Sequence, residues 1–167
     1  MNTSNNKHGF TLLELLIVIG ILAVLATLTF IAINPAELLK RSRDSSRISD
    51  LNTIRTSIDL LQSLGTDISF GVCDGTKVYV SIPSETPLSS AALLPQGVSF
   101  VQVSKDNLQK IDGTGWIPID FKSASGGISS PLSSLPIDPS NTVDINPAKS
   151  FFYTYSCNSS GQYELNV

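Results

Sequence analysis

An unbroken apolar run near the start of the chain constrains its fold more than any other feature. Residues 10–33 read FTLLELLIVIGILAVLATLTFIAI and carry a single charge, on Glu14. As an α-helix this run is about 36 Å long, which is enough to cross a bilayer core of about 30 Å. It fits a secretory signal peptide poorly, because such leaders have a shorter apolar region followed by a small-residue cleavage site. The run predicts one membrane-length helix.

Glu14 is the anomaly within this run. A lone carboxylate in an apolar helix costs about 2.5–3.5 kcal/mol on insertion scales, so it normally has a partner and a purpose. No neighbouring side chain in the run carries a positive charge. A new amine on Phe10, created by cleavage on the same chain or on a neighbouring chain, would supply one. The alternative is a single-pass anchor in which Glu14 lies near the membrane interface.

The charged residues and the single histidine limit the chemistry that is open to the chain. The 167 residues have room for one ordinary domain beside the helix, and 11 basic and 14 acidic residues give a net charge of −3. This balance disfavours specific nucleic-acid binding. His8 precedes the apolar run, so the rest of the chain has no imidazole for general-base catalysis or metal ligation. We expect no enzyme activity and no cofactor, although an acid-pair hydrolase stays open.

The residues at the start of the apolar run match a known processing signature. The residues that carry the match are Lys7, Gly9, Phe10, Thr11, Leu12, Leu13, Glu14, Leu15 and Leu16. They resemble the cleavage and methylation motif of the type IV pilin and type II secretion pseudopilin family. The resemblance implies that residues 1–9 are a leader, that a prepilin peptidase cuts after Gly9, and that the new Phe10 amine is methylated. Gly9 also suits close approach by a protease, because it lacks a Cβ.

The same resemblance implies a structural role for the processed chain. Glu14 would align an incoming subunit with the Phe10 amine of a subunit already placed in a homo-oligomeric helical filament. As a precursor, the chain would cross the inner membrane once, at residues 10–34, and meet an inner-membrane assembly platform. The filament would then lie at the cell surface as a fimbrium or span the periplasm. A pilin of a type IV pilus and a pseudopilin of a secretion or DNA-uptake machine both stay open.

A second helix is predicted directly after the apolar run. Asn34 can cap it, Pro35 suits its first position, and Glu37 can complete a capping box. Because a proline inside a continuous helix removes a hydrogen bond, Pro35 predicts a kink or a restart. Apolar residues then recur at helical spacing and predict an amphipathic helix over residues 35–65 that stops at Gly65: Ile48, Leu51, Ile54, Ile58 and Leu61.

All four arginines of the chain lie on this predicted helix, at Arg41, Arg43, Arg47 and Arg55. Acidic residues are interleaved with them and aromatic residues are missing, which argues against nucleic-acid binding. A solvated face of mixed ion pairs is one interpretation. We prefer the hypothesis that some of the arginines pair with acidic residues of adjacent subunits.

Residues 66–167 predict a β-rich head. Short apolar runs alternate with turn residues, at 77–82, 98–103, 116–121, 151–156 and 162–167. Asp74-Gly75 and residues 158–161 predict turns, the latter within a hairpin. The expected fold is α+β and pilin-like, with the amphipathic helix packed on a small antiparallel sheet.

Cys73 and Cys157 are the two cysteines of the chain. In an exported protein an even pair predicts a disulfide, whereas two unrelated buried thiols are the alternative. A bridge between them would close a loop of about 85 residues and contribute about 4 kcal/mol in the chain-entropy model.

The segment 135–141, LPIDPSN, resembles less specifically the Leu-Pro-x-Asp-Pro segment of major pseudopilins and related pilins. Asp138, Asn141, Asp144 and Asn146 carry oxygen atoms that suit calcium. The same residue types form ordinary turns, and the calcium-loop pattern of the family is missing, so we expect no metal site.

A third class of function is a membrane-anchored domain that binds a ligand. An adhesive head would recognise sugars or DNA, for which Trp116 and Tyr79 are weak candidates. Trp116 stands beside Ile117 and close to Ile119, a pattern more typical of a core residue than of a ligand cage.

Overall fold

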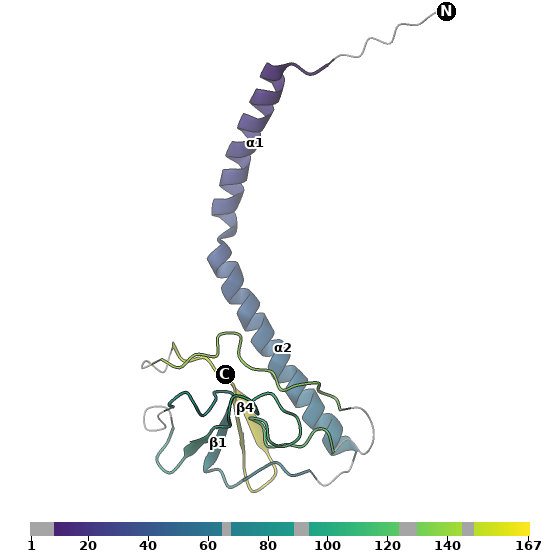
Figure 1. The fold of residues 1–167 in the computed structure, drawn as a ribbon, viewed down its shortest axis with the longest axis vertical. Coiled ribbons are helices and arrows are strands. Elements are labelled where there is room, and N and C mark those ends of the chain that lie inside the picture. Colours follow the sequence, from purple (N-terminus) through teal and green to yellow (C-terminus); the bar gives the residue numbers. More distant parts are fainter. Residues whose placement is uncertain (1–8, 65–67, 89–93, 124–129, 145–148) are drawn as a thin grey trace, which may run out of the picture. The chain divides into compact units, whose positions relative to one another are not determined.

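The computed structural model describes residues 9–64, 68–88, 94–123, 130–144 and 149–167. The chain divides into two compact units, 1–42 and 43–167. Helix α1 (Leu12–Ile33) and the start of helix α2 (Pro35–Ser63) belong to the first unit (Figure 1). The rest of α2 and a four-stranded sheet form the second. The division therefore falls inside α2, whereas the sequence placed boundaries after residues 34 and 65.

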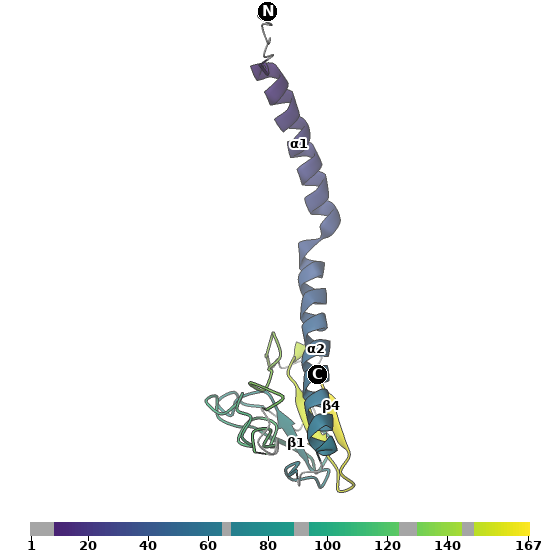
Figure 2. The ribbon, with the colours of Figure 1, turned by 90° about the vertical axis from the view of Figure 1, so that its right-hand side faces the viewer.

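The first unit consists of helix, interrupted once. Asn34 adopts a left-handed conformation with φ of 43° and caps the C-terminus of α1. Its carbonyl oxygen then accepts the first hydrogen bonds of α2, from the N–H groups of Glu37 at 3.0 Å and Leu38 at 3.3 Å. Figure 2 shows the break between the two helices. The predicted restart at Pro35 is confirmed, while the predicted stop at Gly65 lies outside the described residues.

Within the second unit, α2 contributes an apolar face to the core. Ile54, Ile58 and Leu61 are fully buried, as expected for residues spaced by one and two helical turns. Ile48 was predicted on the same face, but its side chain is 65% exposed. That part of the prediction is wrong, because the buried face begins about one turn later, at the half-buried Leu51.

The sheet has the strand order β2-β1-β3-β4. Its strands are β1 (Lys77–Val80), β2 (Ser99–Val101), β3 (Thr154–Cys157) and β4 (Tyr163–Asn166). Strand β3 pairs antiparallel with both β1 and β4, but β1 and β2 are parallel. The sheet is mixed, which corrects the predicted antiparallel sheet. The connection over residues 81–98 is long enough for the crossover that parallel strands need.

The predicted strand at 116–121 is also wrong. No strand includes these residues, and the pairing found there is an isolated bridge between Asp112 and Asp120. The backbone N–H groups of Trp116 and Phe121 bond instead to carbonyl oxygens in the preceding loop. Pro118 has no N–H to offer a sheet. The segment is therefore an irregular part of the core, and Trp116 is a core residue, as predicted.

A hairpin turn and a disulfide complete the head. The hairpin between β3 and β4 closes with a hydrogen bond from the Asn158 N–H to the Gln162 carbonyl, and Gly161 supplies the positive φ of 76°. The disulfide predicted between Cys73 and Cys157 is present. It fastens the segment before β1 to the last residue of β3.

Candidate processing and assembly site

The predicted cleavage point lies in exposed chain without regular secondary structure, just before α1. Gly9 is exposed and Phe10 is 85% exposed. Thr11 caps the helix, with φ of −80° and ψ of 150°, and its Oγ1 accepts a hydrogen bond from the Glu14 N–H at 3.2 Å. The spacing T-x-x-E is that of a capping box. Sequence reasoning missed this role of Thr11, although the pattern is visible in the sequence.

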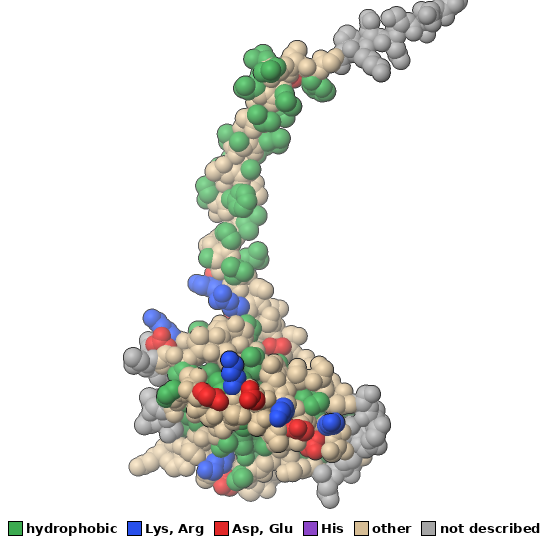
Figure 3. Space-filling model, viewed as in Figure 1, with side chains coloured by type: hydrophobic (Ala, Val, Ile, Leu, Met, Phe, Trp, Pro, Cys, Tyr) green, Lys and Arg blue, Asp and Glu red, His purple; other side chains and the backbone are tan. Residues whose placement is uncertain are grey.

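Glu14 is the acidic residue of the first turn of α1, and the apolar surface of this helix is uncovered. No residue of α1 is buried, and hydrophobic side chains lie along its whole length (Figure 3). Among the described residues, none donates to or pairs with the Glu14 carboxylate. Within the part of the chain that the structure describes, this is also the one helix long and apolar enough to span a membrane.

Two comparisons identify the origin of this arrangement. Residues 4–30 match the family described as the prokaryotic N-terminal methylation motif. The chain has a prepilin-type N-terminus. The "Prepilin peptidase-dependent protein D" of Escherichia coli (strain K12) is 29% identical to it over 116 residues, which cover 67% of this chain and 75% of that protein. No solved structure matches the chain.

These findings confirm the predicted resemblance to type IV pilins and pseudopilins and support a function of that type for this chain. They agree with an α+β fold in which a long apolar helix precedes a second helix and a small sheet. The predicted processing residues Gly9 and Phe10 lie just before α1, and the predicted assembly residue Glu14 lies in its first turn. Pro35 and the two cysteines lie elsewhere in the chain.

The second unit contains a buried ion pair that the sequence analysis did not anticipate. The Arg47 guanidinium donates from Nε to Asp138 Oδ2 at 2.7 Å and from a terminal nitrogen to Asp138 Oδ1 at 3.3 Å. The side chain of Arg47 is 11% exposed and that of Asp138 is fully buried. Arg47 also donates to Asp44 at 2.6 Å, and its guanidinium lies over the ring of Phe151. The ion pair ties α2 to the segment 135–141.

Asp138 is a structural carboxylate in this arrangement. Burial raises its pKa, but the hydrogen bond from Arg47 and the backbone N–H groups of Ser140 and Asn141 outweigh burial and hold the pKa below its ordinary value. Both oxygens of Asp138 are engaged by these donors. Of the other oxygen-bearing residues considered for calcium, Asn146 lies outside the described residues.

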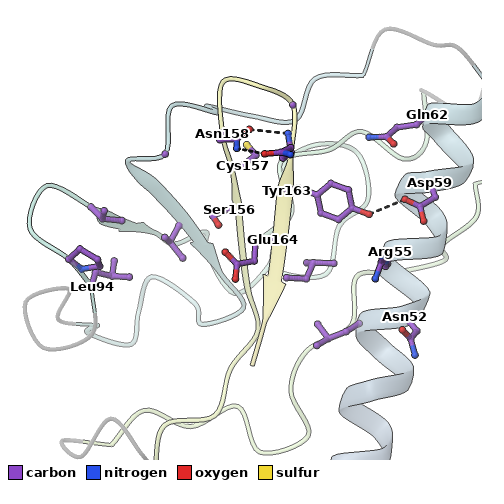
Figure 4. Close-up of a pocket in the computed structure, with 18 residues that line it drawn as sticks. Asn52, Arg55, Asp59, Gln62, Leu94, Ser156, Cys157, Asn158, Tyr163 and Glu164 are labelled. Atoms are coloured by element: carbon purple, nitrogen blue, oxygen red, sulfur yellow. Dashed lines mark hydrogen bonds between the residues drawn. The ribbon is translucent and has the colours of Figure 1, made fainter.

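An open groove of about 1010 Å³ runs along the edge strand β4 and the neighbouring face of α2 (Figure 4). At its centre the Tyr163 hydroxyl donates to Asp59 Oδ1 at 3.0 Å, which joins β4 to α2. Burial and this hydrogen bond raise the pKa of Tyr163 to about 12. Tyr163 therefore stays protonated, and able to donate, up to strongly alkaline pH.

Replacing Tyr163 with phenylalanine is expected to lower the free energy of unfolding of the head by about 1 kcal/mol, because it removes one hydrogen bond to a carboxylate. Since the folded pKa is raised, the contribution of the phenol is present below pH 10 and is lost as pH rises toward 12. Urea unfolding at pH 7 and at pH 11 measures both effects. Glu164→Gln, at the next residue of β4, is the control, with an expected change within about 0.5 kcal/mol.

Proposed function

We propose that the chain is the precursor of a structural pilin in a type IV pilus-like filament. A prepilin peptidase cuts it between Gly9 and Phe10, in keeping with the name of the Escherichia coli relative described above. The processed chain then passes from the membrane through an assembly platform into a helical homo-oligomer held together by α1. In this proposal the chain is a substrate of enzymes and has no catalytic activity of its own.

The observation that carries this proposal is the Glu14 carboxylate, unpartnered among the described residues, near the start of a helix with no buried residue. A charge in such a place is costly in a membrane unless a partner is supplied from outside the helix. A free amine on Phe10 of a neighbouring subunit is a partner of the right sign. Its formation requires the cut after Gly9, which the exposed chain at residues 9–10 leaves accessible.

Mass spectrometry of the mature N-terminus tests the proposed processing. Chain purified from cells that contain a prepilin peptidase is expected to begin with a methylated Phe10. Chain from cells without the peptidase is expected to keep residues 1–9. An intact Met1 in the presence of the peptidase, or a cut beyond residue 20, would contradict the proposal.

A second candidate is a pseudopilin of a secretion or DNA-uptake machine. The segment LPIDPSN supports it, because it resembles a segment of major pseudopilins, although related pilins share that segment. Shearing of intact cells separates the two candidates. A pilin is recovered in the sheared surface fraction, whereas a pseudopilin made at its natural level stays with the cell envelope.

A further inference from the structure

A short basic segment follows the membrane-length helix. Lys40, Arg41 and Arg43 lie on α2 within ten residues of the end of α1, and all three are exposed. Arg41 pairs with Glu37 at 3.3 Å in an open contact in which its side chain is 75% exposed. Among the described residues, Lys40 and Arg43 have no hydrogen-bond or ion-pair partner. This differs from Arg47, whose charge is engaged by Asp138 and Asp44.

The segment begins just beyond the depth of lipid headgroups, at a distance that long side chains can bridge. Helix α1 has 22 residues, a length of about 33 Å against a hydrocarbon core of about 30 Å. Lys40 comes seven residues after Ile33, about 10 Å further along a helix, and headgroups extend about 5–8 Å beyond the core. Helical side chains lean toward the N-terminus, so these long side chains reach back toward the phosphates.

The three charges lie on one half of the helix. At about 100° per residue, Arg41 is about 100° from Lys40 in one direction and Arg43 is about 60° away in the other, so together they cover an arc of about 160°. An arc of this width can face a membrane surface or a protein partner. The position of the segment, directly after the membrane-length helix, favours the membrane surface.

We propose that Lys40, Arg41 and Arg43 bind the phosphate groups of anionic lipids where α2 emerges from the membrane, before the chain enters the filament. The proposal rests on the proposed function only in requiring that α1 cross a membrane. Its consequence is that headgroup contacts fix the depth of the precursor and must be released when the chain is extracted. Each basic residue near an anionic surface contributes to the free energy of membrane binding, and this attraction weakens as salt is added.

A competition between two vesicle populations tests this proposal with the full chain. Detergent-solubilised chain is offered vesicles of phosphatidylcholine alone and vesicles that also contain about 30% phosphatidylglycerol, a fraction chosen to give a clear negative surface potential. Wild type is expected to prefer the anionic vesicles by about tenfold or more at low salt, and K40Q/R41Q/R43Q to lose most of this preference. The control variant K105Q/K110Q/K122Q removes the same charge from exposed lysines of the head and is expected to keep the preference for anionic vesicles.

Three outcomes would overturn the proposal. The first is equal partition of the wild type, and the second is an equal loss in both triple variants. The third is a K40Q/R41Q/R43Q variant that keeps its lipid preference but no longer forms filaments, which would assign these charges to contacts between subunits. Inorganic phosphate is expected to reduce the preference no more than sodium chloride of equal ionic strength, and a larger reduction would indicate a site for free phosphate instead.

The N-terminal mass of each sample separates this proposal from the proposed function. A chain that is cut and methylated normally, yet shows no preference for anionic vesicles, overturns the lipid contact alone. A chain that keeps residues 1–9 in cells with the peptidase overturns the proposed processing, whatever its lipid preference.

Discussion

Replacing Glu14 with alanine is expected to abolish filament formation while the cut after Gly9 proceeds normally. The carboxylate is the one charge in the apolar run and costs about 2.5–3.5 kcal/mol in a bilayer, so its removal holds the helix more firmly in the membrane. In our proposal the variant also lacks the group that pairs with the amine of a neighbouring subunit. We expect filament yield to fall at least about a hundredfold, since a paired charge of this kind is worth about 3–5 kcal/mol when one partner is removed.

Electron microscopy and quantification of sheared filaments measure this effect, and the membrane fraction shows where the chain accumulates. Glu37→Ala is the matched control, because Glu37 is also an acidic residue in the first turn of a helix but lies beyond the apolar run. It is expected to leave filament yield within about twofold, as for an exposed surface substitution. Normal filaments from the Glu14 variant would remove the proposed role of this residue.

Replacing Arg47 with alanine is expected to destabilise the head by about 3–5 kcal/mol, because it leaves the fully buried Asp138 carboxylate without its cation. The side chain of Arg47 also covers the ring of Phe151, so part of the loss comes from packing. Urea unfolding of the full chain in detergent, followed by the fluorescence of Trp116, measures the change. Arg55→Ala on an exposed position of the same helix is the control and is expected to cost less than about 0.5 kcal/mol.

Acid gives an independent measurement of the same ion pair. Because the pKa of Asp138 is lowered in the folded chain, its contribution is complete above the ordinary value of 3.8 and is lost as pH falls through the folded pKa. The wild type is therefore expected to lose stability below about pH 4, and Asp138→Asn to lose less over the same range. Equal acid sensitivity of the two chains would show that Asp138 does not set this response.

Local patterns in the sequence predicted the helical part of the fold well. The apolar run predicted α1, and the Asn34-Pro35 pair predicted the break, because capping and proline geometry are properties of neighbouring residues. The hairpin at Asn158 and the disulfide were also predicted, the first from turn chemistry and the second because the chain offers a single pairing of two cysteines. These features need no knowledge of distant contacts.

The errors concern contacts between distant residues. The many apolar residues at 116–121 suggested a strand, but a buried segment has the same apolar sequence pattern whether or not it belongs to a sheet. The parallel pairing of β1 with β2 depends on how the intervening chain crosses the core, which no local pattern encodes. Arg47 and Asp138 are 91 residues apart, and each alone resembles an ordinary surface or turn residue.

The candidate site was more predictable than the head. Gly9, Phe10 and Glu14 follow one another in a short motif, so their proximity is given by the sequence itself. The capping role of Thr11 was also predictable from spacing, because Thr11 lies three residues before Glu14, whose backbone N–H donates to the hydroxyl oxygen of Thr11. The partner of the Glu14 carboxylate was not predictable from contacts within one chain, and in our proposal it belongs to another subunit.

The packing of α2 against residues near the C-terminus has a consequence for biosynthesis. Ile54 and Ile58 are covered by a core that includes Tyr153 and Tyr155, about a hundred positions later in translation. Contacts between residues so far apart in sequence form slowly, and apolar segments that stay exposed until these contacts form promote aggregation. The nascent head therefore cannot complete its core until nearly the whole chain has left the ribosome.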